Sequence, residues 1–397
     1  MATFSVRFLG CKVSFTDAQS VRERLLADGH TEVEGTGDVA VVNTCCVTHE
    51  AVSKSRQAIS RASRTHERVY VTGCAANLEG AFEGAAANVD VVSRRAEDVA
   101  DAVASAVGAI GCVQADARLE RTRAFVKIQD GCSFSCAFCV IPLVRGGTRS
   151  RRADAVLSEI RKRVSQGHPE IVLTGVNLGC FRDREAGHTL ARLVREAGAT
   201  AGLERLRLSS IEVNHLTGEL VAALRETPSV SAHLHVPLQS GDDAVLGAMK
   251  RRYTAAQFQA KVEPLADFNL TSDVIVGFPG EDEEAFERTL EIVERAGITK
   301  VHVFPYSPRP GTATAARDTV SDEVKKERSA RLRALSDELC RRRWGRRLGT
   351  TDRVLVDRPG RGYADDYTPW LVEAGVGEMV RARAVALSEE GILAVAA

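Results

Sequence analysis

Apolar, β-branched runs alternate with amphipathic segments through the first part of the chain. The segments at 16–29 and 50–64 have helical spacing. The runs that predict strands are 4–10, 39–44, 68–73 and 89–93. Because strands that alternate with helices form a parallel sheet covered by helices, we predict an N-terminal parallel α/β domain over residues 1–118.

The same rhythm continues for longer in the second region, which we place at 119–347. Helical segments such as 153–167 and 283–297 separate its apolar runs. The predicted strands are 125–129, 170–176, 205–211, 232–238, 271–280 and 300–311. Six strand-helix units are enough for an open or complete α/β barrel, whose reactive site would lie at the C-terminal ends of the strands.

Short apolar runs return after an arginine-rich helix near 322–347. They predict four or five short strands within 348–397, enough for a small β-barrel. The predicted fold class is therefore α/β, with an N-terminal parallel α/β domain, a central partial (β/α)6 barrel and a C-terminal small β-barrel.

The overall composition says little about binding partners. Lys plus Arg and Asp plus Glu both number 53, so net charge indicates no partner. One local excess stands out, because residues 325–353 hold 11 basic and 4 acidic side chains. The chain shows neither a signal-peptide pattern nor an apolar run of about 18 to 20 residues, so we expect a cytoplasmic protein without a membrane segment.

Ten cysteines in a reducing compartment favour metal ligands, catalysts or filler over disulfides. The segment DGCSFSCAFCVIP places Cys132, Cys136 and Cys139 in a C-x3-C-x2-C array. Three thiolates on one loop can hold three corners of a 4Fe-4S cluster and leave the fourth iron open. The alternatives are a zinc clip completed by a distant ligand, or chance clustering. Against zinc, the array follows a predicted strand and no second C-x2-C comes after it.

This loop resembles that of the radical SAM superfamily. The resemblance implies a 4Fe-4S cluster whose open iron binds S-adenosyl-L-methionine, and electron transfer from the cluster that yields a 5′-deoxyadenosyl radical. Phe138 matches the aromatic residue that the superfamily usually has before the third cysteine, although it could also simply pack on the barrel rim.

Polar and glycine residues follow several predicted strands and fit adenosylmethionine binding by the same resemblance. Glycine permits close backbone approach, and polar side chains offer bonds to a methionine moiety and ribose hydroxyls. Each of these residues could instead only cap or turn the chain after its strand. They are Gly175, Asn177, Ser209, Glu212, Gln239 and Ser240.

A second set of cysteines shares one context. Cys11, Cys45 and Cys74 each follow an apolar run, with an apolar residue three positions back. Because the ends of parallel strands share one edge of the sheet, their thiolates can converge and suggest a second 4Fe-4S cluster. Buried filler is the alternative. In the doublet Cys45-Cys46, Cys45 has the same position relative to its predicted strand as Cys11 and Cys74 have. Cys46, one residue later, should point to the opposite side, so we predict Cys45 as a ligand and Cys46 as a packing residue.

The segments GCKV, NTCCVTHEA and VTGCAAN resemble the three cysteine motifs of radical SAM methylthiotransferases. That family has this N-terminal domain, a radical SAM barrel and a C-terminal TRAM domain, so the resemblance covers nearly the whole chain. It implies that the second cluster carries the sulfur, that one adenosylmethionine methylates it, and that a second supplies the radical. One departure is Ser14, where the family usually has asparagine.

Further segments, LTGVNLGCF and VHVFPYSPRPGTATA among them, resemble the MtaB-like branch. It converts N6-threonylcarbamoyladenosine, on the 3′ side of the tRNA anticodon, to its 2-methylthio derivative. This implies a tRNA anticodon stem-loop, a reductant such as flavodoxin or ferredoxin, and a sulfur donor as partners. The alternatives are the isopentenyladenosine branch, which usually has GQNVN where this chain has TGVNLG, a ribosomal-protein aspartate as substrate, and a non-enzymatic iron-sulfur or zinc RNA-binding protein.

Three features have both an RNA-binding interpretation and a structural one. The basic stretch 325–353 suits phosphate contacts, or it forms a helix face that links two domains. The arginines of 145–152 could hold phosphates or pair with acids. From residue 351 onward the chain has 5 basic and 8 acidic residues, so this domain could mainly dock, although Tyr363, Tyr367 and Trp370 could stack on bases.

Overall fold

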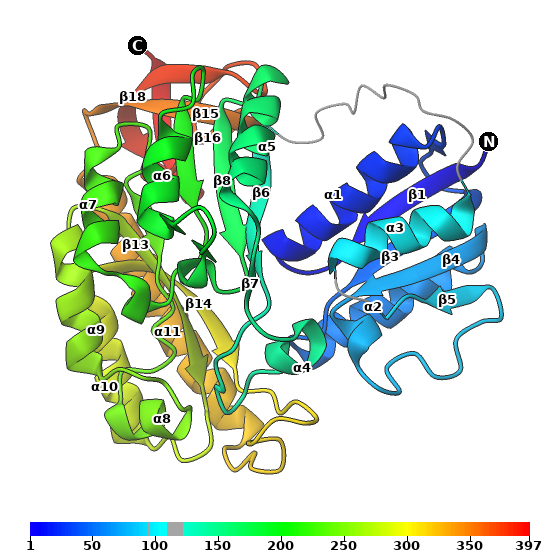
Figure 1. Cartoon of the computed structure of the whole chain (residues 1–397). Helices are drawn as coiled ribbons and strands as arrows, with labels where there is room; N and C mark the ends of the chain where they lie inside the picture. The colour runs from blue at the N-terminus through cyan, green and yellow to red at the C-terminus, as the bar shows by residue number, and fades with distance from the viewer. Residues whose placement is uncertain (94–95, 109–121) are drawn as a thin grey trace. The chain divides into compact units, whose positions relative to one another are not determined.

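The computed structural model describes residues 1–93, 96–108 and 122–397, which form two compact units. The first unit contains Met1–Leu119, Asp130–Thr148 and Arg309–Ala315. The second contains Glu120–Gln129, Arg149–Pro308 and Ala316–Ala397 (Figure 1). The loop that carries Cys132, Cys136 and Cys139 thus groups with the N-terminal residues. The predicted domain boundary near residue 118 lies outside the described residues.

The first unit is built on a parallel sheet, as predicted, and the sheet has five strands because the short β2 adds to the four that were predicted. The strand order is β2-β1-β3-β4-β5, with every pair parallel. The strands are β1 (Thr3–Phe8), β2 (Thr31–Glu32), β3 (Gly37–Thr44), β4 (His66–Gly73) and β5 (Val89–Val91). The helices are α1 (Lys12–Ala27), α2 (His49–Ala62), α3 (Ala96–Val107) and the short α4 (Ile141–Arg145).

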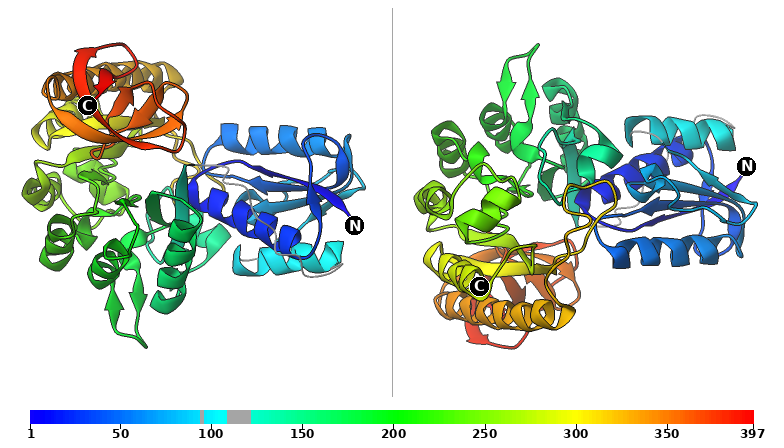
Figure 2. Two further views of the ribbon diagram at one scale, coloured as in Figure 1. Left: turned by 90° about the horizontal axis from the view of Figure 1, so that it is seen from above. Right: turned by 90° about the horizontal axis from the view of Figure 1, so that it is seen from below.

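Alternating residues of β3 pack against opposite helical layers. Val39 and Val41 join the apolar cluster that includes residues of α1 and α3, whereas Ala40 and Val42 join the one that includes α2. Both views in Figure 2 show the sheet between its helices. Because both faces are buried, the strands are nearly continuous apolar runs, and only the residues after the strand ends are available for chemistry.

The second unit contains the predicted partial barrel. Parallel strands form two sheets, β11-β8-β6 with β7 beside β6, and β12-β13-β14. Isolated bridges Leu206↔Val230 and Ser210↔His235 join the two sheets. The strands are β6 (Arg123–Asp130), β7 (Arg149–Ser150), β8 (Glu170–Gly175), β11 (Arg205–Leu208), β12 (His233–His235), β13 (Asn269–Val276) and β14 (Ile298–Pro305).

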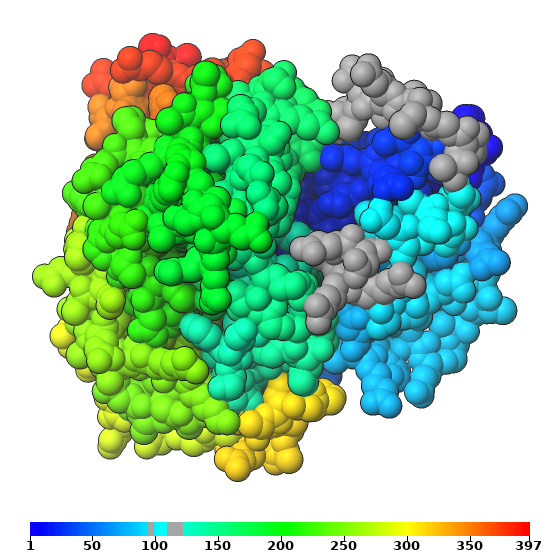
Figure 3. Space-filling model, in the orientation of Figure 1, coloured from blue at the N-terminus to red at the C-terminus, as the bar shows by residue number. Residues whose placement is uncertain are grey.

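Helices cover the outside of this barrel (Figure 1), and Figure 3 shows the same face of the molecule in space-filling form. Apolar residues of the strands and helices share one large core. Side-chain caps begin several helices, as Asp282 does by accepting a hydrogen bond from the Ala285 N–H. The helices are α5 (Ala153–Ser165), α6 (Leu190–Gly198), α7 (Gly218–Glu226), α8 (Asp243–Ala248), α9 (Ala255–Val262), α10 (Glu283–Arg295) and α11 (Asp322–Gly345).

The C-terminal strands close into a small barrel, as predicted, in the order β15-β16-β17-β19-β18. Trp370 is fully buried at its centre, so the expectation that Trp370 stacks on a base is wrong. Its indole instead fills the small core. The strands are β15 (Thr351–Arg358), β16 (Arg361–Tyr363), β17 (Pro369–Leu371), β18 (Met379–Leu387) and β19 (Ile392–Ala396).

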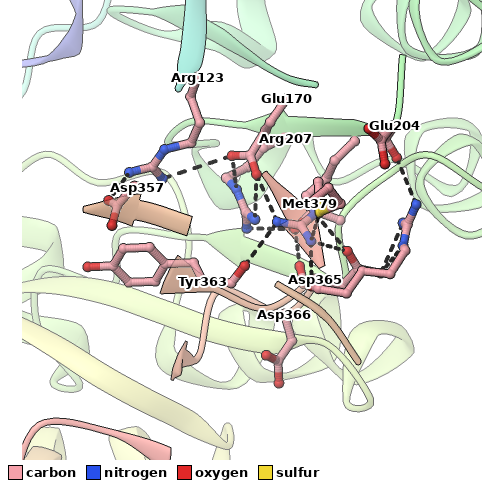
Figure 4. A network of polar contacts seen from close by, with 12 residues as sticks. Arg123, Glu170, Glu204, Arg207, Asp357, Tyr363, Asp365, Asp366 and Met379 are labelled. Carbon is pink, nitrogen blue, oxygen red and sulfur yellow. Dashed lines mark hydrogen bonds and ion pairs between the residues drawn. The ribbon is translucent and has the colours of Figure 1, made fainter. Parts of the chain in front are cut away.

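Acidic residues dock this small barrel onto the first residues of the large barrel's strands (Figure 4). Arg205, which begins β11, lies 3.0 Å from Glu170 at the start of β8 and also binds Asp365. Arg207 donates to the same Glu170 at 2.9 Å. Asn269, which begins β13, donates to the carbonyl of Asp366 at 2.7 Å. The acidic balance of the C-terminal domain therefore serves docking at the N-terminal end of the barrel, the face associated with stability.

Most basic residues of the stretch 325–353 also form ion pairs within the fold. Arg343 and Arg347 pair with Asp366 of the small barrel, and Arg331 and Arg342 pair with glutamates of α10. Tyr363 and Tyr367 stack on each other at 4.6 Å between ring centroids. The structural interpretation of α11 as a helix that links two domains therefore holds for these residues. Lys326, Arg333, Arg341 and Arg346 are exposed. Among the described residues, no helix is long and apolar enough to span a bilayer.

Candidate active site

The three strand-end cysteines lie at one edge of the N-terminal sheet. Cys45 follows β3 directly and Cys74 follows β4 directly. Cys11 differs from the prediction, because β1 ends at Phe8 and Cys11 is instead the residue before α1. The cause is Gly10, whose φ of +122° turns the chain before the helix.

Close packing brings these thiols together. A Cβ on Gly10 would lie 3.0 Å from the Cβ of Cys45, so only glycine permits this approach without a shift. Burial, together with the charges of the neighbouring Cys74 and Cys11 thiolates, raises the pKa of Cys45 to about 11. Ser14 is buried with its hydroxyl 3.9 Å from the Cys11 sulfur. The edge therefore brings together three thiols from three segments that are far apart in the sequence.

Cys46 is fully buried in an apolar cluster with Cys74, Val140 and Val144. A hydrogen bond to Cys74, together with burial, raises the pKa of the Cys46 thiol. The hydrogen bond from Cys46 lowers the pKa of Cys74 to about 7 against the cost of burial, with help from the charge of Arg145. Cys46 thus packs and supports Cys74, and the assignment of Cys45 as the ligand stays a prediction.

The second thiol set occupies the loop after β6, and backbone contacts fix its shape. Gly131 has φ +68°, and a Cβ there would lie 2.1 Å from the carbonyl oxygen of Gly147. The Cys132 N–H donates to the Gly146 carbonyl at 3.0 Å. The loop is thereby closed at its base, and Cys132, Cys136 and Cys139 are all partly exposed on it. Phe138 is half-buried between them in the chain.

Arg145 connects the two thiol sets within the first unit. It ends α4, the short helix that follows the loop, and its Nε donates to the Cys74 sulfur at 3.0 Å. Its other nitrogens bind Asp17 of α1 at 2.8 Å and Asp130 at the end of β6 at 3.0 Å. Burial opposes its charge, but Cys74 and the two aspartates raise the pKa of Arg145. A buried cation therefore lies against one thiol of the strand-end set and is held by the base of the loop.

Other arginines just after the loop pair with acids. Arg151 binds Glu159 at 2.6 Å, and Arg152 binds Asp154 and Glu185. Of the two alternatives for the 145–152 stretch, pairing with acids therefore applies to these two arginines.

The strand-end residues predicted for adenosylmethionine all lie in the second unit. Gly175 ends β8, and a Cβ there would lie 3.0 Å from the side-chain oxygen of Gln129. That oxygen accepts a hydrogen bond from the Asn177 N–H at 2.7 Å. Gly175 is therefore needed for close approach of Gln129, which fixes the turn that carries Asn177.

The remaining predicted residues differ in how their polar groups are used. The Ser209 hydroxyl is buried without a hydrogen-bond partner among the described residues, which favours a ligand there. Glu212 accepts from the Asn214 N–H and from Arg251. Gln239 has φ +69°, a strained conformation that is common at functional sites. Ser240 is fully buried, and its hydroxyl lies 3.4 Å from that of Thr289 on α10.

The donor chemistry fits the groups that the sequence implied. Each set offers three thiols, the ligand type that iron-sulfur clusters take, and Arg145 offsets thiolate charge at the strand-end set. The buried Ser209 hydroxyl fits a polar ligand such as adenosylmethionine. Sequence reasoning missed Asp17, Asp130 and the contact of Arg145 with Cys74. Of these, only Asp130 could have been noticed in the sequence, because it directly precedes the GCS segment of the loop motif.

Two family models match the chain. Residues 126–293 match the Radical SAM superfamily, and residues 3–94 match the Uncharacterized protein family UPF0004. Among solved structures, the radical S-adenosylmethionine methyltransferase TsrM from Kitasatospora setae, with cobalamin and a [4Fe-4S] cluster bound, is similar with a TM-score of 0.59. At 14% identity, over 79% of this chain and 77% of that one, it shows a shared fold.

Curated relatives cover far more of the sequence. The chain is 37% identical to the threonylcarbamoyladenosine tRNA methylthiotransferase MtaB of Bacillus subtilis (strain 168), over 86% of this chain and 82% of that protein. It is 34% identical to MtaB of Thermotoga maritima, over 99% and 96%. It is also 35% identical to the tRNA-2-methylthio-N(6)-dimethylallyladenosine synthase of Alkalilimnicola ehrlichii, over 89% and 86%. With this identity and coverage, the chain belongs to the radical SAM methylthiotransferase family.

Proposed function

We propose that this enzyme converts N6-threonylcarbamoyladenosine next to the tRNA anticodon, at position 37, to its 2-methylthio derivative. The observation that carries the proposal is the match to MtaB proteins over nearly the whole of both chains. The isopentenyladenosine branch is the second candidate, because a dimethylallyladenosine synthase is almost as similar. The segment TGVNLG, in place of GQNVN, favours the first.

The two thiol sets suit two different tasks. Cys132, Cys136 and Cys139 would hold the cluster that binds S-adenosylmethionine, and a second 4Fe-4S cluster would sit on the strand-end thiols, Cys11, Cys45 and Cys74. When bound, the first cluster with its adenosylmethionine supplies hydrogen-atom abstraction, and the second supplies the inserted sulfur. The protein's own contribution is to hold the thiols and to place a buried cation beside Cys74.

The predicted strand-end residues would bind adenosylmethionine. Gly175 and Asn177 shape one turn around Gln129, and Ser209 offers a buried hydroxyl. We also infer contributions from Phe138, Glu212, Gln239 and Ser240. The Ser240 hydroxyl already contacts Thr289, so its backbone is the better candidate for a ligand contact.

Partners and compartment follow from a tRNA substrate. The anticodon stem-loop would be the bound segment, and exposed cations such as Arg333 and Arg341 on α11 suit phosphate contacts. A low-potential reductant such as flavodoxin or ferredoxin and a sulfur donor would complete the reaction. We place the reaction in the cytoplasm, where tRNA is modified, and assign the methylthiotransferase, radical SAM and TRAM-like domains to 1–118, 119–347 and 348–397.

Nucleoside mass spectrometry of tRNA tests the proposal. A deletion strain should lose 2-methylthio-N6-threonylcarbamoyladenosine, accumulate the unthiolated nucleoside, and regain the product with the wild-type gene but not with Cys136→Ala. The 2-methylthio-isopentenyladenosine pool serves as an internal control and should not change. Loss of that pool alone would instead establish the second candidate, and an unchanged nucleoside profile would contradict both.

A further inference from the structure

Three potential metal ligands meet on neighbouring strands of the large barrel, and none of them lies near a cysteine along the chain. They are His235 on β12, Asp273 on β13 and His302 on β14. One ligand atom from each lies within 4.8 Å of the other two. All three residues belong to the second unit, so the arrangement depends on one compact body alone.

Strand register places the three side chains on one face. Asp273 pairs directly with His302 across β13 and β14, and His235 pairs with Thr271, two residues before Asp273. Their neighbours Leu234, Val274 and Val301 point the other way, into the core shared with the outer helices. The histidines and the aspartate therefore face the inside of the barrel.

This face adjoins the predicted adenosylmethionine contacts, because His235 ends β12 and the Gln239 N–H donates to the Asp273 carbonyl, but it also extends deeper into the barrel. Asp273 and His302 each come three residues before the last residue of their strand. At about 3.3 Å per residue, that is roughly 10 Å before the C-terminal ends. A complete barrel fills this layer with branched apolar side chains, but here it holds imidazoles, a hydroxyl and a carboxylate.

His235 is already oriented as a ligand. Its Nδ1 lies 2.9 Å from the Thr271 hydroxyl, and its Nε2 lies 3.2 Å from an Asp273 carboxylate oxygen. Metal-binding histidines commonly hold one ring nitrogen on a partner in this way, so that the other nitrogen is directed at the ion. The exposure of the three residues rises from buried His235 through half-buried Asp273 to exposed His302, which leaves an entry path.

The charge of this cluster calls for a cation. Within the described residues, an Asp273 carboxylate oxygen lies 3.2 Å from His235 Nε2, and this carboxylate forms no ion pair with a lysine or an arginine. Two imidazoles and a carboxylate, with positions left open, are the donor set of mononuclear iron(II) and zinc sites.

We propose that His235, Asp273 and His302 form a binding site for one divalent transition-metal ion of the kind that imidazole and carboxylate bind, distinct from the thiolate sites. The ion would compensate Asp273, and three protein donors would leave coordination positions open to water or to a carboxylate ligand. The inference does not rest on which nucleoside the enzyme modifies.

Cobalt(II) binding to the anaerobically reconstituted holoenzyme tests the site, with Co²⁺ alone as the probe. Each chain should take up one cobalt ion whose visible absorption shows nitrogen and oxygen ligation and no sulfur charge-transfer band, and Zn²⁺ should displace it. His302→Ala and Asp273→Asn should each weaken the cobalt affinity by about tenfold or more. His302 is exposed, so its loss leaves the core packing unchanged.

The matched control is His188→Ala. His188 pairs with Glu196 at 2.9 Å, which is a histidine-carboxylate pair that is not among the three-ligand groups of the described residues. This variant should bind cobalt as the wild type does. The proposal is overturned if the wild type takes up no cobalt with nitrogen and oxygen ligation. It is equally overturned if His302→Ala binds the ion as tightly as the wild type, since the cobalt would then be adventitious.

Discussion

The two thiol sets of this enzyme are assembled in opposite ways. Cys132, Cys136 and Cys139 lie within one short loop, where a glycine turn and local backbone hydrogen bonds set their positions. The other set comes from three distant segments: Cys45 and Cys74 directly follow strands β3 and β4, and Cys11 directly precedes α1. The loop set depends on local geometry, whereas the strand-end set depends on the whole N-terminal sheet.

The two sets also differ in their electrostatic surroundings. The loop cysteines are partly exposed, whereas Cys45 and Cys74 are buried, and Cys74 accepts a hydrogen bond from the buried cation Arg145. Since Arg145 is also held by Asp130 at the base of the loop, one residue touches both regions. We therefore expect substitutions in the loop set to abolish adenosylmethionine cleavage. Substitutions in and around the strand-end set should range from loss of its cluster to a small shift in the reduction potential of that cluster.

The largest effect should come from Cys136→Ala. Loss of one loop ligand should abolish reductive cleavage of S-adenosylmethionine, because three thiolates are needed to hold a cluster with one open iron. Product analysis of the dithionite-reduced enzyme checks this. Cys74→Ala is the comparison and should still cleave adenosylmethionine, so cleavage lost in both variants would show that the two sets do not act separately.

Next in size is the contrast between the neighbours Cys45 and Cys46. Cys45→Ala should lower the iron content by about half, because the strand-end cluster is lost and the loop cluster remains. Cys46→Ala should keep its iron, since Cys46 lies in the apolar cluster with Val140 and Val144. Iron and sulfide analysis after reconstitution measures the cluster content of both variants. The reverse pattern would show that Cys46, and not Cys45, is the ligand.

A smaller, graded effect is expected at Arg145. Arg145→Met removes a positive charge beside Cys74 and should lower the reduction potential of the strand-end cluster, on the order of tens of millivolts, because the reduced state gains negative charge. It also removes the guanidinium that pairs with the buried Asp17 and Asp130, at a cost of about 3 to 5 kcal/mol in unfolding free energy.

Arg145→Lys keeps the charge and provides the second variant if the first folds poorly. It should restore most of the potential but not all of the stability, because an ammonium group cannot reproduce the three directed contacts. Redox titration followed by electron paramagnetic resonance separates the two clusters. Equal shifts in both clusters, or none in the strand-end cluster, would contradict the assigned role of Arg145.

Glu170→Gln should affect stability and leave both clusters intact. Against the cost of burial, Arg207 and Arg205 lower the pKa of Glu170 to about 2. Because this folded-state pKa lies below the unfolded value near 4.3, the stabilisation is present above about pH 4.3 and is lost as the pH falls towards 2. The variant should lose about 3 kcal/mol at neutral pH and show a flatter acid limb in denaturant titrations of the apoprotein.

The smallest effect is expected from Ser14→Ala. The Ser14 hydroxyl lies 3.9 Å from the Cys11 sulfur, which is at most a weak interaction. Iron content should stay unchanged, with a change in unfolding free energy of about 1 kcal/mol or less. Loss of iron in this variant would mean that the serine, which replaces the usual asparagine, supports the cluster directly.

The fold class could be predicted from the sequence because its signals are local. Alternating patterns identify the parallel sheets and the small barrel, and the spacing of Cys132, Cys136 and Cys139 predicts them as one ligand set. The strand-end set needed the topological rule that parallel strands share an edge, and its detail was less accurate, since Gly10 ends β1 early and moves Cys11 to the start of α1.

Contacts between distant segments could not be read in this way. Arg145 reaches Asp17 and Cys74 through the fold, and no spacing rule connects those positions. The excess of acids in the C-terminal domain indicated docking only in general terms, and the structure identifies the contacts, since Asp365 and Asp366 bind arginines of the barrel and of α11. His235, Asp273 and His302 likewise meet only through strand register.

The most direct test of the account is a comparison of iron in two triple variants. One replaces Cys132, Cys136 and Cys139 with alanine, and the other replaces Cys11, Cys45 and Cys74. Mössbauer spectroscopy after anaerobic reconstitution should find one 4Fe-4S cluster in each variant and two in the wild type, with adenosylmethionine cleavage retained only by the second variant. If either variant keeps two clusters, or if each loses both, the assignment of one cluster to each thiol set is contradicted.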